Sequence, residues 1–225
     1  MIESQQLLYL LQLVSPTLPV GAYSYSEGLE TLVEQKIIHD GDTLSHWLSQ
    51  SLSCGSVRVE TAIMLRAYRE FSIGNFDRIT FWNNWLSASR ETTELRQQSW
   101  QMGQSLGKLL LQLSPGLQAT SLKSIFPCNY AIVFGIAAAH GGIKIDLATT
   151  GYLQAWTSNL INAAVRLIPL GQTTGQLILK ELGPCLLSAG QDILTLDDGE
   201  LASCNWGLSL ASMQHEVQYS RLFRS

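Results

Sequence analysis

Apolar residues recur along most of the chain at spacings of three and four, which is the period of an amphipathic α-helix. The first such pattern covers residues 4–14 and ends before Pro16, because proline disrupts a helix interior. A second begins at Asp42, which we expect to cap a helix whose apolar face carries Leu44 and Leu48. Further helices are predicted at residues 57–71, 77–89, 91–113, 117–125, 129–140, 146–167, 173–188 and 200–210.

The clearest pattern lies in residues 91–113, where leucines and a methionine form one stripe and glutamines and a lysine occupy the remaining face. Gly103 and Gly107 are four residues apart on this helix. Such a pair would favour dimerisation in a membrane, but the polar flanks indicate close helix packing in water.

Alternating strand patterns are almost missing, and residues 192–196 are the one weak candidate. We also find no repeat and no linker long enough to separate two domains. The sequence therefore predicts an all-α, single-domain bundle of about nine to ten helices covering residues 1–225.

Charge is scarce, at 14% of residues, and the middle of the chain holds least of it. Residues 97–179 contain five formal charges: Lys108, Lys123, Lys144, Asp146 and Arg166. We interpret this shortage as a surface covered by partner proteins or by a second copy of the chain. The alternative is that Gln, Ser and Thr solvate this surface.

The overall charge excludes some classes of partner. The net charge is −4 and no basic run occurs, so the sequence lacks the positive charge typical of nucleic-acid binding.

The first residues carry Glu3 and no basic segment, unlike a signal peptide. The longest apolar stretch, 130–139, is too short to span a membrane. We expect a cytoplasmic protein with reduced cysteines, because its four cysteines are widely separated.

Catalytic and metal-binding motifs are not evident. The Gly107-Lys108 pair lacks the following Ser or Thr of a phosphate-binding loop, and Asp197-Asp198 precedes a glycine, as in a turn. No two histidines pair at helical spacing. His215, next to Glu216, is the best metal-ligand candidate, but a site needs three or four ligands.

Two polar clusters have structural interpretations. Ser24 and Glu27 are three residues apart at a predicted helix start, as in a capping box, so that Glu27 need not be a general base. Thr173 and Gln176 repeat that spacing. Arg166 then falls in the last turn of a helix, where it suits the helix dipole. Its functional alternative is an arginine finger supplied to a GTPase.

The last segment, HEVQYSRLFRS, combines aromatic residues with arginines, as interface anchors do. We predict that residues 211–225 form a C-terminal tail that docks on a partner. The alternative is that the tail packs on its own bundle.

Four segments resemble the UreF family of urease accessory proteins and together span nearly the whole chain. They are LLQLVSPTLPVGAYSYSEGLE, SRETTELRQQSWQMGQSLGKLL, SNLINAAVRLIPLGQTTGQ and HEVQYSRLFRS. Thr174 departs from the family pattern, in which many relatives carry an acidic residue, so no role is carried over to that position.

The resemblance implies a helical, dimeric accessory protein without catalysis or a cofactor of its own. UreF-like proteins bind the accessory protein UreD, also called UreH. The pair recruits the nickel-carrying GTPase UreG to apo-urease, where GTP hydrolysis is coupled to nickel delivery. The chain would be a scaffold that bridges these partners and regulates the GTPase.

Carried over to this sequence, the resemblance implies two groups of binding residues. The tail residues that would dock on the UreD-like partner are Tyr219, Arg221, Leu222, Phe223 and Arg224. The residues that would shape the dimer or the GTPase-facing surface are Tyr23, Ser26, Glu27, Arg90, Glu94, Arg96 and Arg166. An intrahelical pair of Arg90 with Glu94 is the structural alternative for two of them.

Two rival functions stay open. The chain could be a stand-alone nickel-binding metallochaperone, although the sequence offers no Cys/His cluster. It could also be a helical enzyme that uses Glu27 or Glu94 as a base.

Overall fold

The computed structural model describes residues 4–114, 117, 125–204 and 206–225, and within these ranges it contains helices and no strand. Two 3₁₀ turns, η1 (Ala22–Ser24) and η2 (Asp198–Glu200), accompany eleven α-helices. The α-helices are α1 (Ser4–Leu13), α2 (Leu29–Glu34), α3 (Gly41–Cys54), α4 (Ser56–Ser72), α5 (Phe76–Ser89), α6 (Thr93–Leu113), α8 (Tyr130–His140), α9 (Ile145–Leu167), α10 (Gln172–Glu181), α11 (Gly183–Leu194) and α12 (Trp206–Glu216). The prediction of an all-α fold is confirmed, with slightly more helices than expected.

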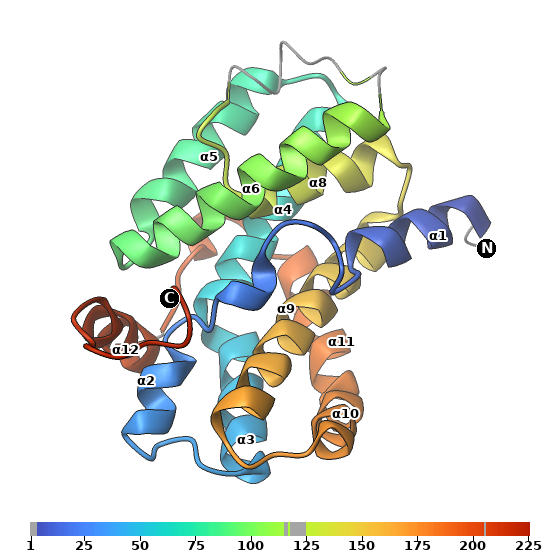
Figure 1. Ribbon diagram of the computed structural model, residues 1–225. Coiled ribbons are helices and arrows are strands. Elements are labelled where there is room, and N and C mark those ends of the chain that lie inside the picture. The colour runs from blue at the N-terminus through green and yellow to red at the C-terminus, as the bar shows by residue number, and fades with distance from the viewer. Residues whose placement is uncertain (1–3, 115–116, 118–124, 205) are drawn as a thin grey trace.

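The helices enclose two hydrophobic cores. In Figure 1, α5, α6 and α8 surround one end of α4, whereas α2, α3, α10 and α12 lie at the other end of the molecule. The first core lies among α4, α5, α6, α8, α11 and the first half of α9. The second core lies among α2, α3, α10 and the second half of α9. Trp156 of α9 packs against both cores, so α9 joins them.

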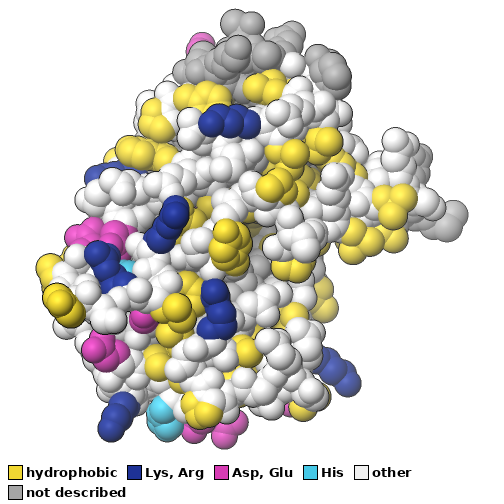
Figure 2. Space-filling model, viewed as in Figure 1, with side chains coloured by type: hydrophobic (Ala, Val, Ile, Leu, Met, Phe, Trp, Pro, Cys, Tyr) yellow, Lys and Arg dark blue, Asp and Glu magenta, His cyan; other side chains and the backbone are white. Residues whose placement is uncertain are grey.

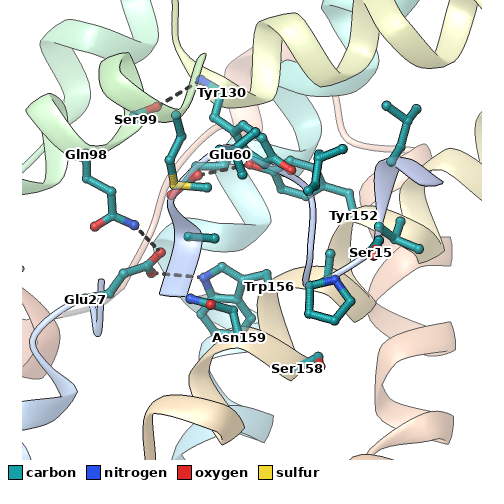
Figure 3. Close-up of a pocket in the computed structure, with 18 of the residues that line it drawn as sticks. Ser15, Glu27, Glu60, Gln98, Ser99, Tyr130, Tyr152, Trp156, Ser158 and Asn159 are labelled. Carbon is teal, nitrogen blue, oxygen red and sulfur yellow. Dashed lines mark hydrogen bonds between the residues drawn. The ribbon is translucent and has the colours of Figure 1, made fainter. Parts of the chain in front are cut away.

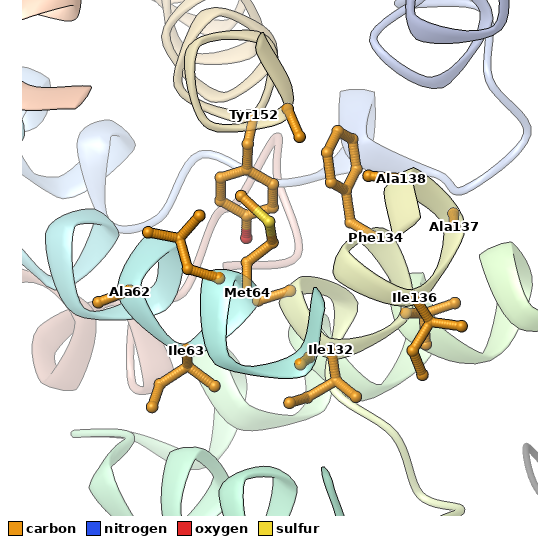
Figure 4. Close-up of a cluster of buried hydrophobic side chains, with 14 of the residues drawn as sticks. Ala62, Ile63, Met64, Ile132, Phe134, Ile136, Ala137, Ala138 and Tyr152 are labelled. Carbon is orange, nitrogen blue, oxygen red and sulfur yellow. The ribbon is translucent and has the colours of Figure 1, made fainter. Parts of the chain in front are cut away.

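The first core is built on the packing of α4 against α8 (Figure 4). Every residue of α8 from Ala131 to Ala138 is buried, which requires a helix that is apolar on all sides. Gly135 allows the two backbones to approach, because an added Cβ would lie 2.4 Å from the carbonyl oxygen of Met64. This burial also accounts for part of the charge shortage in residues 97–179.

Gly103 confirms the expected close packing of the long helix α6. A Cβ added to Gly103 would lie 2.0 Å from the backbone oxygen of Cys128, just before α8. At Gly107 the nearest atom, Cζ of Phe126, is 3.2 Å away. The glycines therefore let α6 rest directly on the backbone that leads into α8.

Helix boundaries near the end of the chain differ from those expected. The predicted helix 173–188 is divided into α10 and α11, because Pro184 lies in the first turn of α11 and lacks the amide that a continuous helix needs. The predicted helix 200–210 begins instead at Trp206, after residues 201–204 run without helical structure. Residues 192–196, the weak strand candidate, finish α11 and the turn after it. The predicted helix 117–125 lies outside the described residues except for its two ends.

Three predicted helix caps are wrong. Asp40, not Asp42, caps α3 and exchanges hydrogen bonds with Thr43 in a capping box. Gly171 precedes α10 without a side-chain cap, so Thr173 does not begin that helix. Gly28 precedes α2, and Glu27 adopts a left-handed backbone (φ 54°) that directs its side chain elsewhere. In contrast, Arg166 does lie in the last turn of α9, as expected.

Candidate functional site

The first residues of the predicted tail 211–225 complete helix α12, which ends at Glu216. The remaining residues, 217–225, are here called the tail and fold back onto the bundle through Glu30 of α2. The backbone amides of Leu222 and Phe223 donate to the two carboxylate oxygens of Glu30, at 2.7 and 3.0 Å. Phe223 is buried in the second core. This half of the tail therefore packs on its own bundle, which was the alternative to partner docking.

The tail also pairs with the segment that follows η1. The backbone oxygen of Ser225 accepts from both the amide and the hydroxyl of Ser26, each at 2.7 Å. The amide of Arg224 donates to the Ser24 oxygen at 2.9 Å. The two segments are 199 positions apart in sequence, so the structure joins candidates that the sequence offered separately.

Arg166 closes the same arrangement from α9. Its Nη2 donates to the backbone oxygen of Tyr23 at 2.6 Å, and its guanidinium carbon lies 4.2 Å from the centre of the Phe223 ring. Arg166 is therefore engaged with both the η1 turn and the tail, while the Tyr23 side chain stays exposed. The structure thus brings Tyr23, Ser26, Arg166 and the tail together.

His215 lies at the base of the tail and is completely buried. Its Nδ1 is 2.7 Å from a Glu94 oxygen of α6, and its Nε2 is 3.3 Å from a Glu30 oxygen of α2. Arg221 of the tail binds the other Glu94 oxygen at 2.5 Å. Both ring nitrogens of His215 are therefore already engaged by carboxylates. Within the described residues, no group of three or more His, Cys, Asp or Glu side chains could hold a metal ion.

Several large apolar side chains are exposed on α12 and the tail, among polar neighbours such as Gln214 and Glu216. Trp206, Leu210, Met213 and Val217 follow each other at spacings of four, three and four, and all four are exposed. Leu222 is also exposed, and the side chain of Tyr219 is fully exposed. We call these six residues the α12–tail surface. Figure 2 shows a second apolar group on the projecting helix α1, where Leu7, Leu8 and Leu11 are exposed.

A cavity of about 80 Å³, mostly apolar but with several buried polar side chains, lies beside the first core and next to Trp156 (Figure 3). Its walls come from the loop after α1 and from α4, α6, α8 and α9. Glu27 enters this cavity because of its left-handed backbone, and its two oxygens accept from Gln98 Nε2 at 3.0 Å and Trp156 Nε1 at 2.9 Å. Glu27 is therefore a buried acceptor and not a helix cap.

Glu60 of α4 lies on the same cavity and forms a buried ion pair with Arg90. Tyr152 donates to the second Glu60 oxygen at 3.3 Å. The Arg90–Glu94 pair, given as the structural alternative, does not form. Arg90 follows the last residue of α5 and turns inward to Glu60, while Glu94 binds His215 and Arg221. Sequence reasoning missed Glu60, although an acid just before the apolar run of residues 62–65 was a usable signal.

Burial, followed by the charge of Glu60, raises the pKa of Glu27 to about 7. Hydrogen bonds from Trp156 and Gln98 and the charge of Arg90 act in the opposite direction and only partly offset this rise. Burial likewise raises the pKa of Tyr152 well above its usual value. The cavity can therefore hold or release a proton at Glu27 near neutral pH.

Arg96, the remaining candidate, lies apart from this cavity on α6. Its guanidinium carbon is 5.7 Å from the ring centre of Trp100, within an open depression between α5 and α6. The structure therefore does not join Arg96 to the tail or to Glu27.

The architecture and this arrangement define an all-α protein with buried carboxylates beside a cavity and a folded-back C-terminal tail. A model of the UreF family matches residues 38–183. The protein named urease accessory protein UreF from Microcystis aeruginosa is 57% identical over 225 residues, covering 100% of both chains. Proteins of the same name from a Nostoc species and from Chromohalobacter salexigens are 55% and 39% identical, over 97% and 96% of this chain and 95% and 93% of their own lengths.

This chain belongs to the UreF family. The resemblance inferred from the four sequence segments is therefore confirmed. The relatives are named accessory proteins, which agrees with the prediction that the chain is not a catalyst. No helix within the described ranges is both long and apolar enough to cross a membrane.

Proposed function

We propose that this chain is a non-catalytic, cytoplasmic scaffold for nickel incorporation into apo-urease. In this proposal it forms a homodimer, binds a UreD/UreH-like protein, and presents the UreG-like GTPase to apo-urease while regulating GTP hydrolysis. The family membership supports a role in urease maturation, because the relatives are named urease accessory proteins and match this chain over nearly their whole length. The observation that carries the binding role is the exposed α12–tail surface.

The α12–tail surface has the properties of a docking site. The six side chains are apolar and exposed, and Tyr and Trp are enriched at interface anchors. The backbone behind them is fixed by Glu30 and Ser26, so binding needs little further ordering of the tail. We therefore assign partner contact to Tyr219 and Leu222, and retention of the tail to Phe223 and Arg221.

The GTPase-facing surface in this proposal contains Tyr23, whose side chain is exposed beside Arg166, and Arg96. Ser26, Glu27, Arg90 and Glu94 support that surface from inside, since their polar groups are used in internal hydrogen bonds or ion pairs. The exposed leucines of α1 offer a further apolar surface for a second copy or a partner.

The test uses a double variant, Tyr219→Ala with Leu222→Ala, in the full chain co-expressed with the UreD/UreH-like protein. Both residues are exposed, so we expect an unchanged melting temperature but at least about a tenfold loss of co-purified partner, the size of one interface anchor. Leu187→Ala with Ile73→Ala is the matched control, since these apolar residues are exposed elsewhere. Unchanged recovery with the tail variant would refute docking at this surface.

A further inference from the structure

Cys54 and Cys204 are brought together from distant parts of the sequence. Cys54 is the last residue of α3, and Cys204 lies in the connection from η2 to α12. The amide of Cys204 donates to the Cys54 oxygen at 2.8 Å, and the Cys54 sulfur lies 3.8 Å from the Cys204 oxygen. Residues joined by a direct backbone hydrogen bond have Cα atoms roughly 5–6.5 Å apart, inside the span of about 4.4–6.8 Å that a disulfide bridges. The Cys54 thiol also donates to the Gln50 oxygen at 3.3 Å, so it must rotate away from its own helix to reach Cys204.

The two other cysteines are placed differently. Cys128 is completely buried, and burial raises the pKa of its thiol, so this residue is a poor nucleophile. Cys185 of α11 lies against Ser49 of α3, with its sulfur 3.6 Å from the serine hydroxyl. Cys54 is partly exposed and Cys204 is exposed, so both are open to an oxidant.

We propose that Cys54 and Cys204 form a reversible, redox-responsive disulfide in this protein. The oxidant is a small disulfide of the glutathione class. One cysteine thiolate attacks this disulfide, forms a mixed disulfide and releases one thiol. The second cysteine thiolate then displaces the other thiol. Two protein thiols and one small disulfide become one protein disulfide and two small thiols.

The disulfide would fix the connection that leads into α12. In the reduced protein, residues 201–204 are held by the amide of Cys204 and by Arg58 Nη1, which donates to the Ala202 oxygen at 3.3 Å. The same segment covers the Glu60–Arg90 pair, because Leu201 and Ser203 line a small cavity above it. Oxidation therefore anchors the start of α12 and the cover of the buried ion pair. This inference rests on the geometry alone and does not depend on the proposed function.

The experiment equilibrates the full chain with glutathione disulfide and counts free thiols after denaturation. We expect a fall from four thiols to two, recovered by dithiothreitol. Digestion after basic residues and after glutamate places Cys54 and Cys204 in peptides 37–58 and 201–216, which mass spectrometry should find linked. A linked loop of this length should raise the melting temperature by about 10 °C.

Two serine variants separate this pair from other chemistry. Cys54→Ser should form no internal disulfide and should keep its melting temperature in glutathione disulfide, losing at most the one thiol of exposed Cys204 to a glutathione adduct. Cys185→Ser should still lose two thiols to the internal disulfide and still gain stability. Linkage of Cys54 to Cys185, glutathione adducts without an internal disulfide, or four unreacted thiols would each overturn the proposal.

Discussion

At the scale of single residues, the backbone at Glu27 decides what its carboxylate does. Sequence spacing suggested a helix cap, because Ser24 and Glu27 have the right separation. The left-handed conformation of Glu27 and Gly28 turns the carboxylate into the cavity, where Trp156 and Gln98 hold it. Spacing along a chain contains no information about that turn, and the contacts come from residues more than 70 positions away.

Replacement of Glu27 by Gln should change how stability depends on pH. The folded pKa of about 7 exceeds the unfolded value of 4.5, so the folded protein binds the proton more tightly. The free energy of unfolding of the wild type should therefore fall as pH rises from about 4.5 through 7, by about 3 kcal/mol in total. Urea titrations between pH 5 and 8 should show a smaller fall for Glu27→Gln.

The matched control is Glu34→Gln, which changes an exposed carboxylate on α2 and should keep the wild-type slope. Equal slopes for all three proteins would contradict a raised pKa at Glu27.

The Glu27→Gln variant also tests the rival view of Glu27 as a catalytic base. Full urease activation by Glu27→Gln would count against catalysis at this carboxylate.

At the scale of the elements, the period of the apolar residues was the most reliable guide. It identified α1, α4, α5, α6, α8 and α9 within a few residues, because each buries a face or a whole surface in a core. The period predicted the wrong helix boundaries where a single residue, such as a proline or a capping residue, ends or begins a helix. The amide-lacking Pro184 separates α10 from α11, and Asp197 caps the short turn η2, so that residue 200 ends this turn and does not begin α12.

The close approach of α6 to the segment before α8 predicts a cost for a single methyl group. Gly103→Ala should lower the free energy of unfolding by about 2–3 kcal/mol, because the neighbouring atom is backbone and cannot rotate away. Urea denaturation with a constant m-value would measure this. Gly207→Ala in α12 is the control, since nothing lies within 4 Å of its added Cβ. A loss below about 0.5 kcal/mol at Gly103 would mean that the two segments separate easily.

At the scale of the whole molecule, the tail is the part whose placement the sequence left open. Its composition indicated an interface, yet Phe223 and Ser225 are buried within the chain itself while Tyr219 and Leu222 face outward. Buried and exposed side chains alternate in this part of the chain, which explains why the sequence HEVQYSRLFRS fitted both partner docking and packing on its own bundle. The joining of Ser26 and Arg166 to the tail could not be inferred, because helical periods do not specify distant pairs.

Arg166 provides a test that separates a structural clamp from an arginine finger. Its contacts with Tyr23 and Phe223 favour the clamp, so Arg166→Ala should lower GTP hydrolysis by the assembled complex less than about tenfold. Hydrogen exchange of residues 217–225 should instead become faster, because the tail loses one support. Lys180→Ala, on the exposed side of α10, should change neither measurement. A loss of about a thousandfold in hydrolysis would identify a finger.

Helix α9 has a consequence for the way the protein responds to strain. Its first half belongs to one core, its second half to the other, and Trp156 touches both beside the cavity. Neither core can unfold without disturbing α9, so heat or denaturant should unfold both cores in one cooperative transition. Helix α9 is thus the structural element that the two cores share.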